Sequence, residues 1–287
     1  MIVAHRGGMA YAPENTVAGF VNGQRLETDI LEMDVQVRGN EVIVLHDDTL
    51  DRTTDCSMES SKADALTRAS CDAGFTWRAG TTPYSGGVGG LSLRGKGIRI
   101  PILAGVVDGI SNSNAIFMIE LKHFDRGAGE LSIEQAMDTL ITFIVERSLE
   151  NRIWLVSFNA YIIFRAEAMA PTVSTMLVWA SQMPLTCEER VLDAISRGID
   201  GVAIQAPWTE PANPDFTSCV QIAQNAGMVV AFWLVNRPGQ VEYLLQFKPD
   251  MMMTDFPACL AALLRDVRIA NPYPDEVGDS RYLPKCG

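Results

Sequence analysis

Short β-rich runs alternate with helical patterns along most of this chain. Such alternation predicts an α/β fold in which the strands of a parallel sheet are joined by crossover helices. Nine runs have the composition of strands, one more than an eight-stranded (β/α) barrel needs. The expected strands are Ile2–His5, Ile30–Val37, Val42–His46, Ala115–Leu121, Ile153–Phe158, Ser174–Trp179, Gly201–Gln205, Val229–Val235 and Met251–Asp255.

The extra strand is explained by the short connection between the second and third runs. Only Arg38 to Glu41 lie between them, too few residues for a crossover helix, so the two strands must form a hairpin. The second strand is expected to pass the barrel rim, turn at Gly39–Asn40 and return antiparallel. The sequence therefore predicts a (β/α)8 TIM barrel with a β-hairpin extension after strand 2. This return brings His46 to the rim, where barrel enzymes keep their catalytic residues.

Residues 1–287 are expected to form a single TIM-barrel domain, because a chain of this length can close one large core. A segment of about 51–113 interrupts the alternation and is rich in Ser, Thr and Gly. We expect it to be an insertion over the C-terminal face of the barrel. Its glycine run at 86–90 follows no strand and precedes no clear helix, which argues against a phosphate-binding loop. The polar tail of about 271–287 is expected to lie on the surface.

The charge balance excludes some classes of partner. Lys and Arg number 23 against 35 Asp and Glu, which gives a net charge of −12 and argues against a nucleic-acid-binding protein. The longest apolar runs, such as Met228 to Val235, are much shorter than the roughly 20 residues of a membrane helix, so no stable membrane insertion is expected. Nothing in the sequence indicates the oligomeric state.

The cysteines bear on the cellular compartment. Six are present without a CxxC pair or a Cys/His zinc spacing. Free thiols in a reducing compartment are the ordinary expectation, and Cys56 with Cys71 is the pair that could form a disulfide. Ile2 and Val3 already have the composition of a strand, so we expect no signal peptide in the chain as given. The expected location is cytoplasmic as the chain stands, or periplasmic or secreted if a leader has been removed.

Two of the three histidines end predicted strands. His5 lies in Ala4-His5-Arg6-Gly7, and His46 lies in Leu45-His46-Asp47. Imidazoles titrate near neutral pH, so two of them at one barrel rim can divide the general acid and general base roles. Which histidine is the acid and which the base is left open.

Carboxylates form the second cluster of candidate site residues. Glu32 and Asp34 are two apart on one strand and therefore point to the same face. Glu120 and Lys122 have the same spacing at the end of another strand. Three inward carboxylates offer hard oxygen ligands for Mg²⁺ or Ca²⁺, and the lysine suits an anionic substrate. The alternative is an internal salt-bridge cluster of the same four residues.

Other candidates lie next to these two groups. Arg6 follows His5, and its planar guanidinium suits a phosphate. Glu14 either orients Arg6 or His5 or simply marks the start of a helix, for which Asn15 is the expected N-cap. Phe158 and Trp233 are expected either to line the pocket or to pack in the core. His123 is expected on the surface or behind the site.

An ordered series of motifs resembles the glycerophosphodiester phosphodiesterase family, a phospholipase C-like phosphodiesterase TIM barrel. The resemblance covers residues of about 1–54 and 98–265. The matching motifs are Ala4-His5-Arg6-Gly7, Pro13-Glu14-Asn15-Thr16, Glu32-Met33-Asp34-Val35, His46-Asp47, Arg52-Thr53-Thr54, Ile119-Glu120-Leu121-Lys122, Ser157-Phe158, Trp233 to Asn236 and Thr254-Asp255-Phe256-Pro257.

The resemblance implies a metal-dependent hydrolase that converts glycerophosphodiesters to glycerol 3-phosphate and an alcohol, with a place in lipid and glycerol metabolism. It implies that His5 and His46 are the acid/base pair. It further implies that Glu32, Asp34 and Glu120 are metal ligands and that Arg6 and Lys122 contact the phosphate. The partner is then a small-molecule glycerophosphodiester.

Two other functions remain as alternatives. One is a phospholipase D-like enzyme acting on lysophospholipids, since such enzymes share a two-histidine, metal-dependent site. The other is a non-catalytic phosphodiester-binding protein. The chain departs from the family in its hairpin turn, where Arg38 and Asn40 replace the usual Thr and Asp. Its insertion is also longer than in compact members, which bears on substrate preference.

Overall fold

Eight parallel strands close into a barrel in the computed structural model, which describes residues 1–26, 28–78, 92–110, 114–122, 131–207 and 214–269. Strand β1 pairs with β9 on one side and with β2 on the other, which closes the sheet. The strands are β1 (Ile2–Ala4), β2 (Ile30–Arg38), β3 (Glu41–Val44), β4 (Ile116–Leu121), β5 (Ile153–Ser157), β6 (Ser174–Trp179), β7 (Gly201–Gln205), β8 (Val229–Trp233) and β9 (Met251–Thr254). The predicted (β/α)8 barrel is therefore confirmed.

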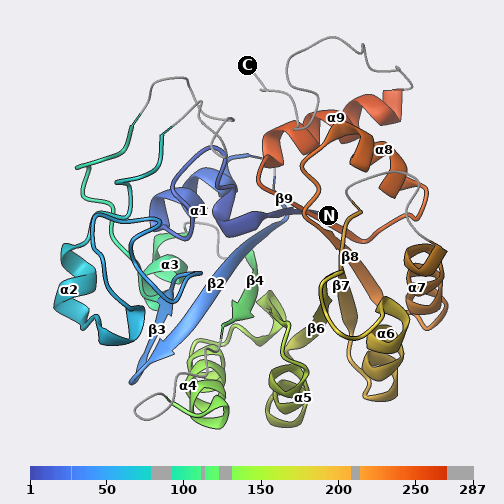
Figure 1. The fold of residues 1–287 in the computed structure, drawn as a ribbon, viewed down its shortest axis with the longest axis horizontal. Helices are drawn as coiled ribbons and strands as arrows, with labels where there is room; N and C mark the ends of the chain where they lie inside the picture. The colour runs from blue at the N-terminus through green and yellow to red at the C-terminus, as the bar shows by residue number, and fades with distance from the viewer. Residues whose placement is uncertain (27, 79–91, 111–113, 123–130, 208–213, 270–287) are drawn as a thin grey trace.

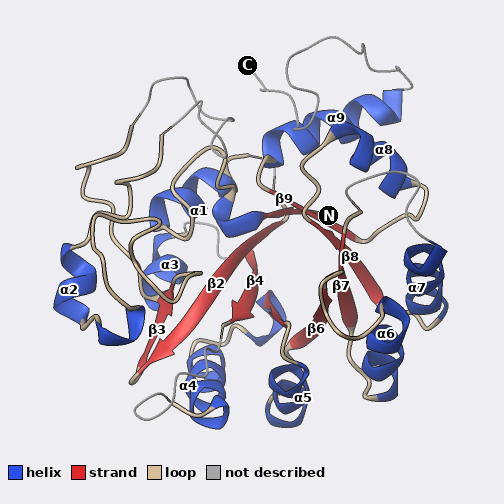
Figure 2. Cartoon of the chain, viewed as in Figure 1, coloured by secondary structure: helices blue, strands red, loops and turns tan. Residues whose placement is uncertain are grey.

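Helices surround the strands (Figures 1 and 2). They are α1 (Val17–Gln24), α2 (Ala65–Ser70), α3 (Leu103–Gly109), α4 (Ile133–Glu146), α5 (Ala160–Met169), α6 (Cys187–Ser196), α7 (Pro214–Asn225), α8 (Pro238–Leu245) and α9 (Pro257–Ile269). The apolar faces of the helices pack on the outside of the barrel in two large clusters. Among the described residues, none of these helices has the length and apolar character that crossing a bilayer requires.

Strand β3 is the ninth strand, and it pairs antiparallel with the far end of β2. The register runs from Val35 opposite Val44 to Arg38 opposite Glu41, with the turn at Gly39–Asn40. Gly39 has a φ of 59°, a left-handed conformation that glycine adopts without steric cost. The hairpin deduced from the short connection is confirmed.

The barrel interior changes from apolar to charged along the strands. Residues at alternate positions of a strand share one face, so Ile30, Glu32 and Asp34 all point inward from β2. Ile30 and Met118 belong to the buried apolar cluster inside the barrel. The carboxylates follow toward the C-terminal ends, where Asp34 pairs in register with Glu120. The apolar layer thus lies deeper in the barrel than the charged residues.

The described part of the segment 51–113 packs beside the hairpin and the loop after β1. Trp77 is fully enclosed, and its indole N–H donates to the carbonyl of Met9 at 3.2 Å. Helix α3, at the end of this segment, packs Leu103 and Val106 into the outer core of the barrel. The glycine run at 86–90 lies outside the described residues, as does the tail 270–287.

Two disulfides join pairs of residues that the structure describes. Cys56 is bonded to Cys71, the pair noted in the sequence, and Cys187 of α6 is bonded to Cys219 of α7. No cysteine among the described residues is free. The expectation of free thiols is therefore wrong for these residues. The second pair is not apparent from the sequence, because only the packing of adjacent helices brings it together.

Candidate active site

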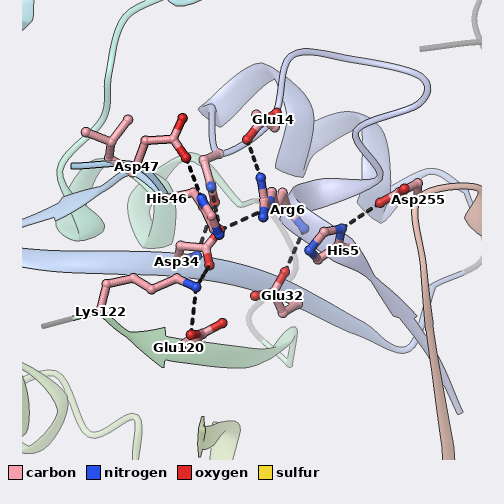
Figure 3. A network of polar contacts seen from close by, with 12 residues as sticks. His5, Arg6, Glu14, Glu32, Asp34, His46, Asp47, Glu120, Lys122 and Asp255 are labelled. Carbon is pink, nitrogen blue, oxygen red and sulfur yellow. Dashed lines mark hydrogen bonds and ion pairs between the residues drawn. The ribbon is translucent and has the colours of Figure 1, made fainter. Parts of the chain in front are cut away.

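A small cavity of about 100 Å³ opens at the C-terminal ends of the barrel strands. Its lining includes most of the residues that the sequence singled out: His5, Arg6, Glu32, His46, Glu120, Lys122, Phe158 and Trp233. Figure 3 shows the charged members of this group converging from β1, β2, the hairpin and β4. The sequence therefore identified a group of residues that the fold does bring together.

His5 and Arg6 lie in a short turn directly after β1. The Nδ1 of His5 donates to Oδ1 of Asp255 at 2.5 Å, which leaves Nε2 for the cavity. Arg6 has a φ of 51°, an uncommon conformation for a residue with a side chain. This backbone lets its N–H donate to Oε2 of Glu32 at 2.7 Å while its guanidinium binds Oε1 of Glu14 at the same distance. Strained backbone of this kind is concentrated at functional sites.

His46 follows β3 and reaches the same cavity from the hairpin. Its Nδ1 donates to Oδ1 of Asp47 at 2.6 Å. Its side chain is 32% exposed, compared with 11% for His5. Both imidazoles are thus held at Nδ1 by a carboxylate and keep Nε2 for a substrate.

Glu32, Asp34 and Glu120 form a compact carboxylate cluster. One ligand oxygen from each lies within 4.8 Å of the other two. Glu32 and Asp34 are almost completely buried. Three carboxylates so close together repel one another, and their hard oxygens are the donors that Mg²⁺ and Ca²⁺ prefer. The donor set and its unbalanced charge fit a divalent cation.

The pKa values of the cluster reflect burial, the repulsion between the carboxylates and the neighbouring cations. Burial and the charge of Asp34 raise the pKa of Glu32 well above its usual value. Burial also raises the pKa of Glu120, although Lys122 opposes the change. Asp34 behaves differently. Burial would raise its pKa, but the charges of Lys122 and Arg6 hold it well below its usual range.

The two cations predicted to contact phosphate lie against these carboxylates. Lys122 Nζ is 2.7 Å from Oε1 of Glu120 and 3.3 Å from Oδ1 of Asp34. Arg6 Nε is 3.2 Å from Oδ2 of Asp34. Burial would lower the pKa of Lys122, but the charges of Asp34 and Glu120 raise it, so this side chain stays a cation. The salt bridges of the alternative interpretation are therefore present, and they join the cavity-lining residues Arg6, Glu120 and Lys122 to Asp34, which lies behind the lining.

The remaining candidates have different surroundings. Phe158 and Trp233 both line the cavity and pack edge to face with ring centres 5.4 Å apart. Glu14 binds Arg6, as the functional interpretation of this residue requires, and it lies outside the helix. His123 lies outside the described residues.

Three residues with clear contacts in the site were not among the predicted site residues. Asp47 and Asp255 hold the two histidines, and Asn15 donates to Oδ2 of Asp34 at 2.8 Å. Asn15 is therefore not the N-cap of α1. Thr16 has that position, and its hydroxyl accepts from the N–H of Gly19. The position of Asp255 at the end of the last strand was an available signal, because barrel enzymes place catalytic groups there.

Comparison with known proteins decides the family. Residues 5–259 match the sequence pattern of the "Glycerophosphoryl diester phosphodiesterase family". The chain belongs to this family. Membership makes it an enzyme of the phosphodiesterase class, as its sequence motifs indicate.

Relatives within the glycerophosphoryl diester phosphodiesterase family extend over almost the whole chain. A glycerophosphodiester phosphodiesterase from Caldanaerobacter subterraneus subsp. tengcongensis is 27% identical, over 92% of this chain and 98% of its own. An Oleispira antarctica phosphodiesterase, solved in complex with the product sn-glycerol-3-phosphate, has a TM-score of 0.74 at 20% identity, over 92% of this chain and 96% of its own. A glycerophosphodiester phosphodiesterase from Agrobacterium tumefaciens has a TM-score of 0.68 at 20% identity, over 91% and 98% of the two chains. These two solved structures confirm the fold.

Proposed function

We propose that this protein hydrolyses glycerophosphodiesters to sn-glycerol 3-phosphate and an alcohol in a metal-dependent reaction with two histidines as general acid and base. Such a reaction belongs to lipid and glycerol metabolism. One observation carries the proposal. Two imidazoles, each held at Nδ1 by a carboxylate, line one cavity together with two cations and two members of a three-carboxylate cluster.

The residues of the cavity have complementary roles in this reaction. Arg6 and Lys122 are placed to bind the phosphate oxygens and orient the diester. One histidine takes a proton at Nε2 from the attacking water as its oxygen bonds to phosphorus, and the other gives a proton from Nε2 to the alkoxide that leaves as its P–O bond breaks. Asp47 and Asp255 keep both rings in the tautomer that leaves Nε2 available, and they stabilise each ring when it carries a second proton.

Glu32, Asp34 and Glu120 would hold the divalent cation, Mg²⁺ or Ca²⁺. When bound, the cation supplies charge neutralisation and Lewis-acid polarisation at the phosphate. Lys122 lies beside the same carboxylates and is therefore placed to bind the phosphate oxygens next to this cation. Phe158 and Trp233 provide an apolar wall for the organic part of the substrate.

The first test is a turnover assay with a panel of substrates and metals. We expect glycerophosphocholine and related diesters to release sn-glycerol 3-phosphate. EDTA should abolish this activity, and Mg²⁺ or Ca²⁺ should restore it. A long-chain lysophospholipid in the same panel tests the phospholipase D-like alternative, and binding without turnover would indicate a binding protein. Full activity in metal-free protein would contradict the metal assignment.

For the cellular location, we propose the periplasmic or secreted alternative. The disulfides Cys56–Cys71 and Cys187–Cys219 support it, because disulfides persist mainly in oxidising compartments. Thiol alkylation of the protein from its native cells, without reduction and followed by mass spectrometry, should leave these four cysteines unlabelled. Labelling of all four would place the protein in a reducing compartment.

A further inference from the structure

Arg52 connects two parts of the active site that come from different elements. It lies in the loop after the hairpin, and its guanidinium forms a two-pronged contact with Glu14, at 2.8 Å to Oε2 and 2.7 Å to Oε1. Its Nε donates to Oδ2 of Asp47. One side chain therefore contacts two carboxylates from different loops, one after β1 and the other after β3.

Each of these carboxylates in turn holds a residue that lines the cavity. Asp47 binds the Nδ1 of His46 through its other oxygen, and Glu14 binds the guanidinium of Arg6. The result is a continuous series of contacts from His46 through Asp47, Arg52 and Glu14 to Arg6. Arg52 does not line the cavity, but through these contacts it links the position of His46 to that of Arg6.

Burial makes the contact with Glu14 strong. The Glu14 side chain is only 4% exposed, while that of Arg52 is 41% exposed. Burial favours the protonated form of Glu14, but the hydrogen bonds from Arg52 and the charge of Arg6 lower its pKa. Glu14 therefore stays ionised between two arginines. Because a carboxylate buried in this way needs both partners, its geometry depends on Arg52.

We propose that Arg52 is a positioning residue of the active site, which fixes His46 and Arg6 in one relative orientation through Asp47 and Glu14. This inference rests on the proposed phosphodiester hydrolysis and adds a residue with no assigned role to it. The planar fork of arginine suits the task, because it binds both oxygens of one carboxylate while its Nε binds another. A lysine has a single ammonium group and cannot reproduce this geometry.

The loop that presents Arg52 is held independently of its side chain. The backbone N–H and the hydroxyl of Thr54 both donate to the carbonyl of Leu50, at 3.0 and 2.8 Å. The backbone N–H of Cys56 donates to the Thr54 hydroxyl at 3.0 Å. Leu50 is completely buried. Replacement of the Arg52 side chain should therefore leave the loop folded.

The test compares Arg52→Ala and Arg52→Lys with wild type and with Arg99→Ala. Arg99 is an exposed arginine whose guanidinium donates to the carbonyl of Ile98, so it serves as the matched control. We expect Arg52→Ala to lower kcat about 10- to 100-fold, the usual effect of removing an outer partner of a site. KM should change less than kcat, and Arg52→Lys should recover only part of the loss.

A chemical rescue separates positioning from a merely structural role. Free guanidinium ion at millimolar concentration, far below denaturing levels, should raise the kcat of Arg52→Ala but not that of wild type or Arg99→Ala. Wild-type kcat in Arg52→Ala or in Arg52→Lys would overturn the proposal. The proposal would also be overturned if Arg52→Ala had a lower kcat and a lower Tm and guanidinium did not restore its kcat. If wild type itself hydrolyses no phosphodiester, the proposed function fails before Arg52 is tested.

Discussion

The two histidines of the site acquire their carboxylate partners by different routes. Asp47 is the next residue after His46, whereas Asp255 is 250 residues away from His5. Closure of the barrel brings β9 beside β1 and makes the second pair possible. Asn236 completes this arrangement, because its amide donates to Oδ2 of Asp255 at 2.7 Å. Both histidines thus have a carboxylate at Nδ1, although one of the two pairs depends on the whole fold.

Replacement of the histidines tests whether the two pairs act together. His5→Ala and His46→Ala should each lower kcat by roughly 100- to 10,000-fold, the range of general acid–base catalysis. The double variant should lose little more, because groups that act in one step are not additive. Steady-state kinetics with glycerophosphocholine measures these effects, and circular dichroism checks the fold. Losses that multiply in the double variant would show that the two residues act in separate steps.

The buried carboxylate of Glu32 should make the stability of the metal-free protein depend on pH. Its raised pKa means that the folded state binds this proton more tightly than the unfolded state. The resulting stability is fully present below about pH 4.5, the ordinary glutamate pKa, and is lost as the pH rises through the raised value. Glu32→Gln, which cannot ionise, should therefore have a higher Tm than wild type at neutral pH in EDTA.

Thermal unfolding of both proteins from pH 4 to 8 measures this difference. The two Tm values should converge toward about pH 4.5 and separate at higher pH. Added Mg²⁺ or Ca²⁺ should raise the Tm of wild type, because a ligand that binds only the folded state stabilises it. The same ions should have little effect on Glu32→Gln. Parallel curves for the two proteins at all pH values would contradict the assigned environment of Glu32.

At the scale of elements, the hairpin and the loop after it determine one side of the site. The hairpin carries His46 to the rim, and the loop presents Arg52 to Asp47. The Cys56–Cys71 disulfide closes the end of this loop on helix α2. A hydrogen bond from the backbone N–H of Asp72 to Asp55 strengthens the same junction. The disulfide is thus placed to hold the loop that presents Arg52.

Removal of each disulfide should have a different effect on activity. Cys56→Ala/Cys71→Ala should lower kcat as well as stability, because it loosens the loop that positions Arg52. Cys187→Ala/Cys219→Ala is the matched control, since this pair joins two outer helices. Both double variants should lose about 2–4 kcal/mol of unfolding free energy, as disulfides typically contribute. Thermal unfolding and kcat measure the two effects. An unchanged kcat in the first variant would show that the Cys56–Cys71 disulfide does not help to position Arg52.

At the scale of the whole molecule, an acidic protein must bind an anionic diester. The chain carries a net charge of −12. Around the cavity, carboxylates outnumber the cations; the carboxylates are Glu14, Glu32, Asp34, Asp47, Glu120 and Asp255, and the cations are Arg6, Arg52 and Lys122. A divalent cation at the carboxylate cluster would offset two negative charges. Under the proposed function, such a cation would therefore reduce the repulsion between this acidic molecule and an anionic phosphate.

Local sequence signals determined much of this architecture. The alternation of strands and helices was sufficient to predict the barrel. One connection is too short to hold a crossover helix, so the two strands that it joins must be antiparallel, which predicted the hairpin. Side chains alternate between the two faces of a β-strand, so the spacing of Glu32 and Asp34 placed both on the inward face. Such features depend only on neighbouring residues, which is why the sequence alone determined them.

Only the tertiary structure decided the partners of the site residues. The pairing of His5 with Asp255, the contact of Asn15 with Asp34 and the bridge made by Arg52 all join distant parts of the chain. The Cys187–Cys219 disulfide likewise depends on the packing of two helices. Each contact requires particular side-chain directions as well as barrel closure. Strand periodicity does not contain that information, because it specifies the face of a residue but not which residue comes to lie opposite.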